Sequence, residues 1–128
     1  FAAAAEAGIQ TFRQDTAREK ELLNSLCEKL SALPGLVLTG AHEAPHILNI
    51  AIPGVPTQNT INILQDAGIC VSAGSACAKG HRSHVLTAMG IPGETIDSAF
   101  RVSLCRDNTQ EEIDTLVEVI RRDILPRI

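Results

Sequence analysis

The sequence predicts an α/β sandwich, in which helices pack on one small mixed or antiparallel sheet. Apolar residues recur at steps of three and four near both ends of the chain, which is typical of amphipathic helices. Short apolar or alternating runs between them indicate strands, and Pro34-Gly35 and Pro53-Gly54 indicate tight connections. With 128 residues and 45% hydrophobic content, the chain is expected to form a single domain, residues 1–128, with its own core.

The first half of the chain is predicted to hold two helices and three short strands. A long amphipathic helix is expected over residues 2–32, ended by Pro34-Gly35, and strands over 36–39 and 46–52. Thr57 is expected to cap the second helix, which ends at Gly68, and a short apolar strand follows over 69–72. The first helix carries its apolar positions at Ile9, Phe12, Leu22, Leu23, Leu26, Leu30 and Leu33.

In the second half, a loop over 73–80 rich in Gly, Ser and Ala precedes a short helix over 83–89. Residues 98–105 alternate as a strand, and Thr109 with Glu112 forms a capping box that begins the last helix. We expect the short helix, the last helix and the first helix to share one face of the sheet. Ile113, Leu116, Val117, Ile120 and Ile124 are the expected buried positions of the last helix.

Charge and hydropathy exclude two classes of function. The chain has 11 basic and 15 acidic residues, a net charge of −4, whereas a protein that wraps nucleic acid is normally basic. No apolar stretch approaches the ~20 residues of a membrane-spanning helix, and no signal peptide is visible. We therefore expect no nucleic-acid or membrane partner and a cytoplasmic location. Because the chain begins with Phe1 and its only methionine is Met89, we expect either a processed protein or a domain cut from something longer.

The cysteines are Cys27, Cys70, Cys77 and Cys105. No two of them form a CxxC pair, so a zinc site is not indicated, and no secretory signal supports a disulfide framework. The histidines show no HExxH spacing either, so no metal is expected. The prediction is four thiols, mostly buried as small hydrophobic side chains.

Residues 72–82 are the chemically unusual segment. They place Cys77 among very small residues, between Gly74 and Gly80, which can adopt backbone conformations that other residues resist. If the basic side chains that follow lie near the thiol, they favour the reactive thiolate. The segment therefore suits a nucleophile or a sulfur carrier, although an ordinary surface loop with an incidental cysteine has the same composition. The basic side chains are Lys79, His81, Arg82 and His84.

Arg101 is the second unusual position. It lies in the middle of the last predicted strand, on a face that otherwise carries Ala99, Ser103 and Cys105. Small neighbours leave room for a guanidinium to bind a carboxylate with two hydrogen bonds. The alternative is an ion pair with one of the chain's own acids, or a side chain that reaches solvent.

Several segments, taken in order, resemble the cysteine desulfurases of the NifS/IscS-like class, in the class V aminotransferase superfamily. Residues 71–77 resemble the family's cysteine loop, residues 83–90 the helix after it, and residues 100–104 with 109–114 its closing block. His46 to Ile50 followed by Pro53-Gly54 also fits. The resemblance covers residues 45–122, and the first forty residues match only in kind, as the long helix (residues 1–33) that links a large domain to the small one.

The resemblance implies a pyridoxal-phosphate enzyme of the fold-type I group that converts L-cysteine to L-alanine and holds the sulfur as a persulfide. It implies that Cys77 is the nucleophile in a catalytic loop over 72–82 and that Arg101 binds the substrate carboxylate. Sulfur-acceptor or iron–sulfur scaffold proteins are the implied partners, and the complete enzyme is implied to be a homodimer. The cofactor-binding lysine lies in no matching motif here, so the chain is expected to be the C-terminal small domain, inert alone.

Two other functions remain open from the sequence. A selenocysteine or cystine lyase of the same superfamily could carry a similar loop. A free module that carries persulfide or binds a sulfur acceptor would need no cofactor. The sequence also departs from the family at Cys105, where glycine is common, so a second thiol could lie near Arg101.

Overall fold

The computed structural model describes residues 1–40, 43–73 and 82–128. Its centre is a three-stranded antiparallel sheet in the order β1-β2-β3. The strands are β1 (Val37–Thr39), β2 (Ile47–Ala51) and β3 (Ala99–Ser103). This confirms the predicted α/β architecture with a small antiparallel sheet.

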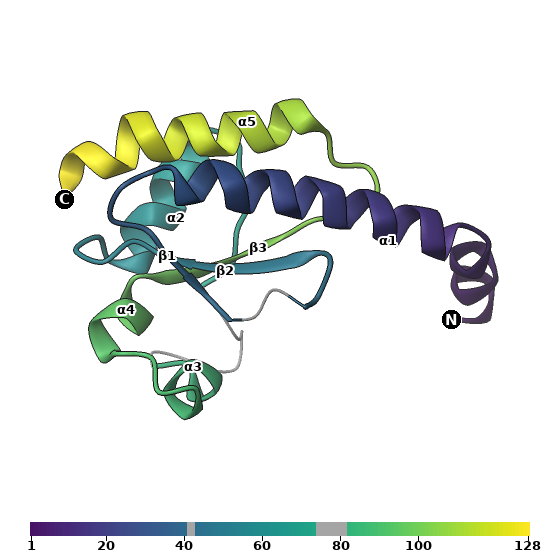
Figure 1. Ribbon diagram of the computed structural model, residues 1–128, viewed down its shortest axis with the longest axis horizontal. Helices are drawn as coiled ribbons and strands as arrows, with labels where there is room; N and C mark the ends of the chain where they lie inside the picture. The colour runs from purple at the N-terminus through teal and green to yellow at the C-terminus, as the bar shows by residue number, and fades with distance from the viewer. Residues whose placement is uncertain (41–42, 74–81) are drawn as a thin grey trace.

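Helices cover both faces of this sheet (Figure 1). On one face lie α1 (Ala2–Ser31), α2 (Thr57–Asp66) and α5 (Gln110–Val119), and on the other lie α3 (His84–Ala88) and α4 (Gly93–Asp97). The chain therefore forms a helix–sheet–helix sandwich. The expectation that the short helix at 83–89 shares a face with the first and last helices is wrong. The buried Leu86 of α3 packs instead with Ala51 and Ala99, which point away from the main core.

The main core lies between the sheet and the layer of α1, α2 and α5. Phe100 and Ile50, which face each other across β2 and β3, are fully buried there. Both are even-numbered strand positions, so their odd-numbered neighbours point to the opposite face. The remaining members of this core are Leu22, Leu23, Leu26, Leu30, Leu48, Ile52, Val55, Leu64, Val102, Leu104, Ile113, Leu116, Val119, Ile120 and Ile124.

Only the second half of α1 contributes to that core. Ile9 and Phe12 are 79% and 66% exposed, although their spacing continues the apolar stripe of the helix. Figure 1 shows the reason: the N-terminal turns of α1 extend beyond the edge of the sheet. Nearer the sheet, Lys29 pairs with Asp114 and so joins α1 to α5.

The last helix begins as predicted. The Thr109 hydroxyl accepts a hydrogen bond from the Glu112 amide, and the Glu112 carboxylate accepts one from the Thr109 amide. After Val119 the helix continues as a π-helical turn (Ile120–Ile124) and a 3₁₀ turn (Leu125–Arg127). Val117 is only half-buried, and Val119 takes the core position in its place.

Three expectations about local structure are wrong. Residues 69–72 form no continuous strand, because the Ile69 amide is still bonded to the end of α2 and only Ser72 pairs with β3. Thr57 does not cap α2, because it is the first residue of the helix, after Pro56. Finally, α4 was not expected. Its five residues are too few for a visible apolar period.

Thr57 instead ties the beginning of α2 to the segment before β3. Its hydroxyl lies 2.9 Å from the Asp97 carbonyl oxygen and 3.0 Å from that of Ala99. On the next turn of the helix, the Thr60 hydroxyl is fully buried and finds no hydrogen-bond partner among the described residues. The two threonines therefore form a natural pair for testing what a buried hydroxyl contributes here.

We predict that Thr57→Val lowers the free energy of unfolding by about 1–2 kcal/mol, because two carbonyl groups lose their donor. Thr60→Val should be neutral or stabilising, because valine has the same shape without an unsatisfied hydroxyl. Urea unfolding of both variants checks this. Equal losses in the two would show that the Thr57 hydrogen bonds contribute nothing specific.

Candidate substrate-binding site

A row of polar side chains crosses the face of the sheet that points away from the main core. Thr39, Asn49 and Arg101 are direct partners on adjacent strands, and Ser72 pairs with Arg101 on its other side. Partners in an antiparallel pair point to the same face, so these four residues lie side by side. They come from four segments distant in the sequence, and only the fold brings them together.

The guanidinium of Arg101 lacks a partner in this row. Arg101 is half-buried, and its Nε atom is buried without any hydrogen-bond acceptor among the described residues. No carboxylate of the described residues lies within 4.0 Å of it, and the undescribed residues 41–42 and 74–81 include no Asp or Glu. An ion pair with the chain's own acids, the alternative that the sequence left open, is therefore not found.

A buried charged donor without an acceptor is costly, and such groups in proteins normally have a partner. The planar guanidinium offers parallel N–H groups that match a carboxylate or another oxyanion. The arrangement around Arg101 therefore suits an anionic group supplied by a ligand. This is the feature of the described structure that most directly indicates a binding site.

The row also includes the beginning of the cysteine segment. The Ser72 amide donates to the Arg101 carbonyl oxygen at 3.0 Å, and the Arg101 amide donates to the Ser72 carbonyl oxygen at 2.7 Å. The segment that the sequence singled out, residues 72–82, thus starts beside Arg101. Cys77 itself, with Gly74, Lys79, Gly80 and His81, lies outside the described residues.

At the other end of that segment, Arg82 is held by an ion pair. Its Nε donates to Asp97 Oδ1 at 2.7 Å and its Nη2 to Asp97 Oδ2 at 2.6 Å. The guanidinium lies against Gly93, where an added Cβ would come within 2.5 Å of Nη1. The hydrogen bonds from Arg82 lower the pKa of Asp97, and the same contacts raise the pKa of Arg82.

This pairing changes one expectation. The sequence placed Arg82 in a basic cluster that could favour a thiolate at Cys77, but its charge is matched by Asp97. Of the other members, His84 is exposed at the start of α3, and Lys79 and His81 are outside the described residues. Arg82 acts in the described structure as an anchor between residue 82 and α4.

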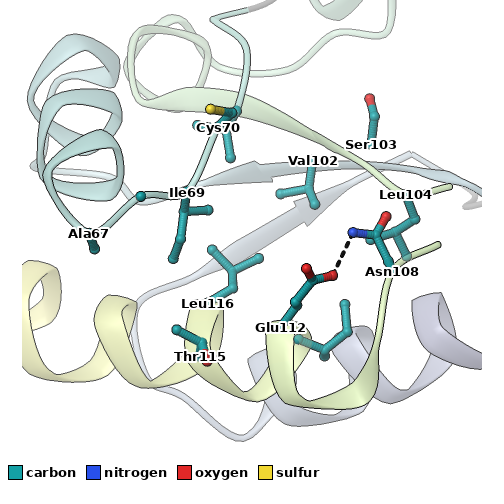
Figure 2. Close-up of a pocket in the computed structure, with 13 residues that line it drawn as sticks. Ala67, Ile69, Cys70, Val102, Ser103, Leu104, Asn108, Glu112, Thr115 and Leu116 are labelled. Carbon is teal, nitrogen blue, oxygen red and sulfur yellow. Dashed lines mark hydrogen bonds between the residues drawn. The ribbon is translucent and has the colours of Figure 1, made fainter.

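A cavity elsewhere in the described structure does not share these properties. It has a volume of about 380 Å³ and lies between the segment 67–71, β3 and α5 (Figure 2). Figure 2 shows apolar side chains around it, and the polar pair Asn108 and Glu112 at one side bonded to each other. Glu112 also caps α5, and the Asn108 oxygen accepts from the Cys105 amide. These groups complete a helix terminus, so we assign no binding function to this cavity.

Three thiols are within the described structure, and none supports the expected burial. Cys70 and Cys105 are exposed, and Cys27 is half-buried in α1, where burial raises the pKa of its thiol. The expectation of mostly buried cysteines is therefore wrong for these three. Short side chains at the sheet edge and in a turn do not reach the core.

The described lysines do not fit the cofactor that the family resemblance implies. The lysines that the structure describes, Lys20 and Lys29, both lie on α1, and Lys29 pairs with Asp114. Neither lies on the face of the sheet that carries Arg101. Within the same described residues, no cluster of three His, Cys, Asp or Glu side chains could hold a metal ion. No described helix is long and apolar enough to cross a membrane.

Sequence reasoning found Arg101 but missed the residues around it. Asn49 and Thr39 were not singled out, although a signal was present: Asn49 is the one amide in an otherwise apolar strand. The Arg82–Asp97–Gly93 contact carried no such signal. It depends on α4, which the sequence did not reveal.

Comparison with known proteins places these features in a family context. The family model for aminotransferase class-V matches residues 1–116. A cysteine desulfurase of Nostoc sp. is 35% identical over 121 residues, which cover 89% of this chain and 30% of that protein. The cysteine desulfurase IscS of Escherichia coli is 37% identical over 111 residues, which cover 84% of this chain and 27% of that protein.

A comparison with a solved structure indicates the same similarity. A NifS-like protein matches with a TM-score of 0.83 and 29% identity, over 99% of this chain and 32% of that chain. The chain thus spans less than a third of the length of these relatives. The match also extends across residues 1–44, where the sequence resemblance was only general.

We predict that Arg82→Ala raises the pKa of Asp97 toward its ordinary value, because the hydrogen bonds from Arg82 are the main cause of its lowering. The lowered pKa means that the pair stabilises the folded state above about pH 4 and that this contribution is lost as the pH falls through the folded-state pKa. A carboxyl NMR titration of Asp97 measures the change.

Arg122→Ala is the matched control, because Arg122 donates to Asp123 through the same two nitrogen atoms, near the C-terminal end of the chain. It should raise the pKa of Asp123 and leave that of Asp97 unchanged. An Asp97 pKa that does not respond to Arg82→Ala would rule out the anchor.

Proposed function

The chain belongs to the class-V aminotransferase family, and on that premise we propose that it is the C-terminal small domain of a cysteine desulfurase. In this proposal the complete protein converts L-cysteine to L-alanine, and Cys77 holds the sulfur as a persulfide. The similarity to cysteine desulfurases along 84–89% of the chain supports it. The linking helix is α1, and the catalytic loop is the segment 72–82.

The observation that carries the proposal is the guanidinium of Arg101, whose buried Nε has no acceptor among the described residues. An amino-acid substrate brings a carboxylate, an anion that a planar guanidinium binds with two parallel hydrogen bonds. Arg101 lies in the middle of β3, and its backbone is hydrogen-bonded to Ser72. A substrate bound there would be held by a rigid element, as a binding site requires.

The position of the cysteine segment relative to Arg101 is the second support. The segment begins at Ser72, the partner of Arg101 in the sheet. Cys77 is the fifth residue after Ser72, and this length of chain spans at most about 18 Å. A thiol carried by this segment is therefore within reach of a substrate whose carboxylate is bound to Arg101.

The sulfur transfer that we propose balances without an external oxidant. The thiolate of Cys77 attacks the sulfur of L-cysteine, and a sulfur–sulfur bond forms as the carbon–sulfur bond of the substrate breaks. The electron pair of the broken bond stays with carbon, which takes up the proton that the substrate thiol gave up. The products are L-alanine and a Cys77 persulfide, which a sulfur-acceptor or scaffold protein would receive.

Pyridoxal phosphate, the cofactor of this proposal, would supply the stabilisation of charge on the substrate carbon. Because no lysine of this chain lies in a motif that matches the family's cofactor-binding lysine, it would be held by a part of the protein outside this chain. The chain alone should then be inactive. We further propose a cytoplasmic homodimer, and the free thiols of Cys27, Cys70 and Cys105 support a reducing compartment.

We predict that Cys77→Ala in the complete protein lowers alanine production from L-cysteine by at least about 100-fold, because the sulfur loses its acceptor. The cofactor absorbance should be unchanged. Cys70→Ala and Cys105→Ala, which remove exposed thiols of the same domain, should retain activity. Full activity of Cys77→Ala would instead indicate a lyase of the same superfamily that releases its product without a persulfide.

We predict that Arg101→Lys raises KM for L-cysteine by about 10–100-fold, because an ammonium group cannot form the paired hydrogen bonds of the guanidinium. The effect on cysteamine, which has the thiol and amine but no carboxylate, should be small. Steady-state kinetics of the complete protein with both compounds separate these effects. An equal loss for cysteamine would exclude carboxylate binding at Arg101.

A further inference from the structure

We propose that Asn49 is a second donor to the substrate carboxylate bound by Arg101, and that Thr39 positions it. This inference rests on the proposed function and extends it to residues for which neither the sequence motifs nor the relatives' names give a role. It starts from the register of the sheet. Asn49 lies between Thr39 and Arg101, as the direct partner of both, and all three side chains share one face.

The Asn49 amide has a defined orientation. The buried hydroxyl of Thr39 donates to Asn49 Oδ1 at 2.6 Å. The amide oxygen is therefore the end of the side chain that faces β1 in the structure. The amide nitrogen, with its two N–H groups, is then left for the side of β3, where Arg101 lies.

Neither donor group of this pair is used within the described part of the chain. The Asn49 Nδ2 makes no hydrogen bond to a described residue, and the Arg101 Nε is buried without an acceptor. Asn49 is half-buried, as is Arg101. Two adjacent donors with no acceptor among the described residues are complementary to one carboxylate, which has two oxygens and about four lone-pair positions.

The alternative to a binding site is that the polar side chains of this row have only a structural role in the sheet. It accounts for the Thr39–Asn49 hydrogen bond, but it gives the Asn49 Nδ2 and the Arg101 Nε no acceptor among the described residues. A bound carboxylate satisfies both. Since Arg101 supplies the charge, Asn49 would contribute orientation, fixing the second oxygen and hence the direction of the rest of the substrate.

The test uses the complete protein with its cofactor and measures KM and kcat for L-cysteine. Asn49→Ala should raise KM about tenfold, the typical effect of one hydrogen bond to a charged group, with little change in kcat. Asn49→Asp should raise it further, because an aspartate would pair with Arg101 and compete with the substrate. Thr39→Val should raise KM several-fold by freeing the amide to rotate, and Thr39→Ser, which keeps the hydroxyl, should behave as the wild type. Thr60→Val is the control for a buried threonine remote from this face.

Calorimetric binding of L-alanine, which has the carboxylate but no thiol, gives a readout that does not need turnover. Affinity for L-alanine should fall about tenfold in Asn49→Ala and stay unchanged in Thr60→Val. If Arg101→Lys weakens L-alanine binding and Asn49→Ala does not, Arg101 binds the carboxylate alone and the inference is overturned. Failure of the proposed function would look different: the wild type would produce no alanine from L-cysteine, while the binding measurement would still decide the role of Asn49.

Discussion

The register of β2 on β3 is the constraint on which the rest of the structure depends. With Ile50 opposite Phe100, both side chains enter the main core, and the helices α1, α2 and α5 can close over them. The same register places Asn49 opposite Arg101 on the other face. A slip by one residue would turn Arg101 into the core and Phe100 into solvent, so the hydrophobic core enforces the position of the polar row.

The sequence predicts the features of the fold that appear as a periodic pattern of apolar residues, and it does not predict those that depend on contacts between distant segments. The alternation of residues 98–105 predicted which side of β3 is buried, and with it the face that carries Arg101. The neighbours of Arg101 could not be predicted, because strand order and register are set by packing between distant segments. For the same reason the sequence did not show that residues 69–72 pair with β3 at Ser72 alone, or that α3 and α4 cover the second face.

Two arginines on this side of the sheet illustrate how burial separates an anchor from a binding residue. Arg82 is 57% exposed, and its partner Asp97 is 52% exposed, so solvent screens their pair and either group could exist alone at modest cost. Arg101 is half-buried on β3 with its Nε out of solvent, and none of the described acids pairs with it. The exposed Arg82 is accounted for by its partner Asp97, whereas the buried Nε of Arg101, which has no acceptor among the described residues, is accounted for by an anionic ligand.

The proposed roles of substrate binding and sulfur transfer fall on two kinds of structural element. Arg101, Asn49 and Thr39 are fixed by backbone pairing on three neighbouring strands, so their relative positions change only if the sheet itself changes. The cysteine belongs to a separate segment, attached to that row at Ser72 and to α4 through Arg82. In the proposed function a persulfide would be formed at the substrate and then given to another protein, so its carrier would have to serve two places. A carboxylate site on the sheet would hold the substrate independently of the thiol, and for that reason different elements of the fold suit the two proposed roles.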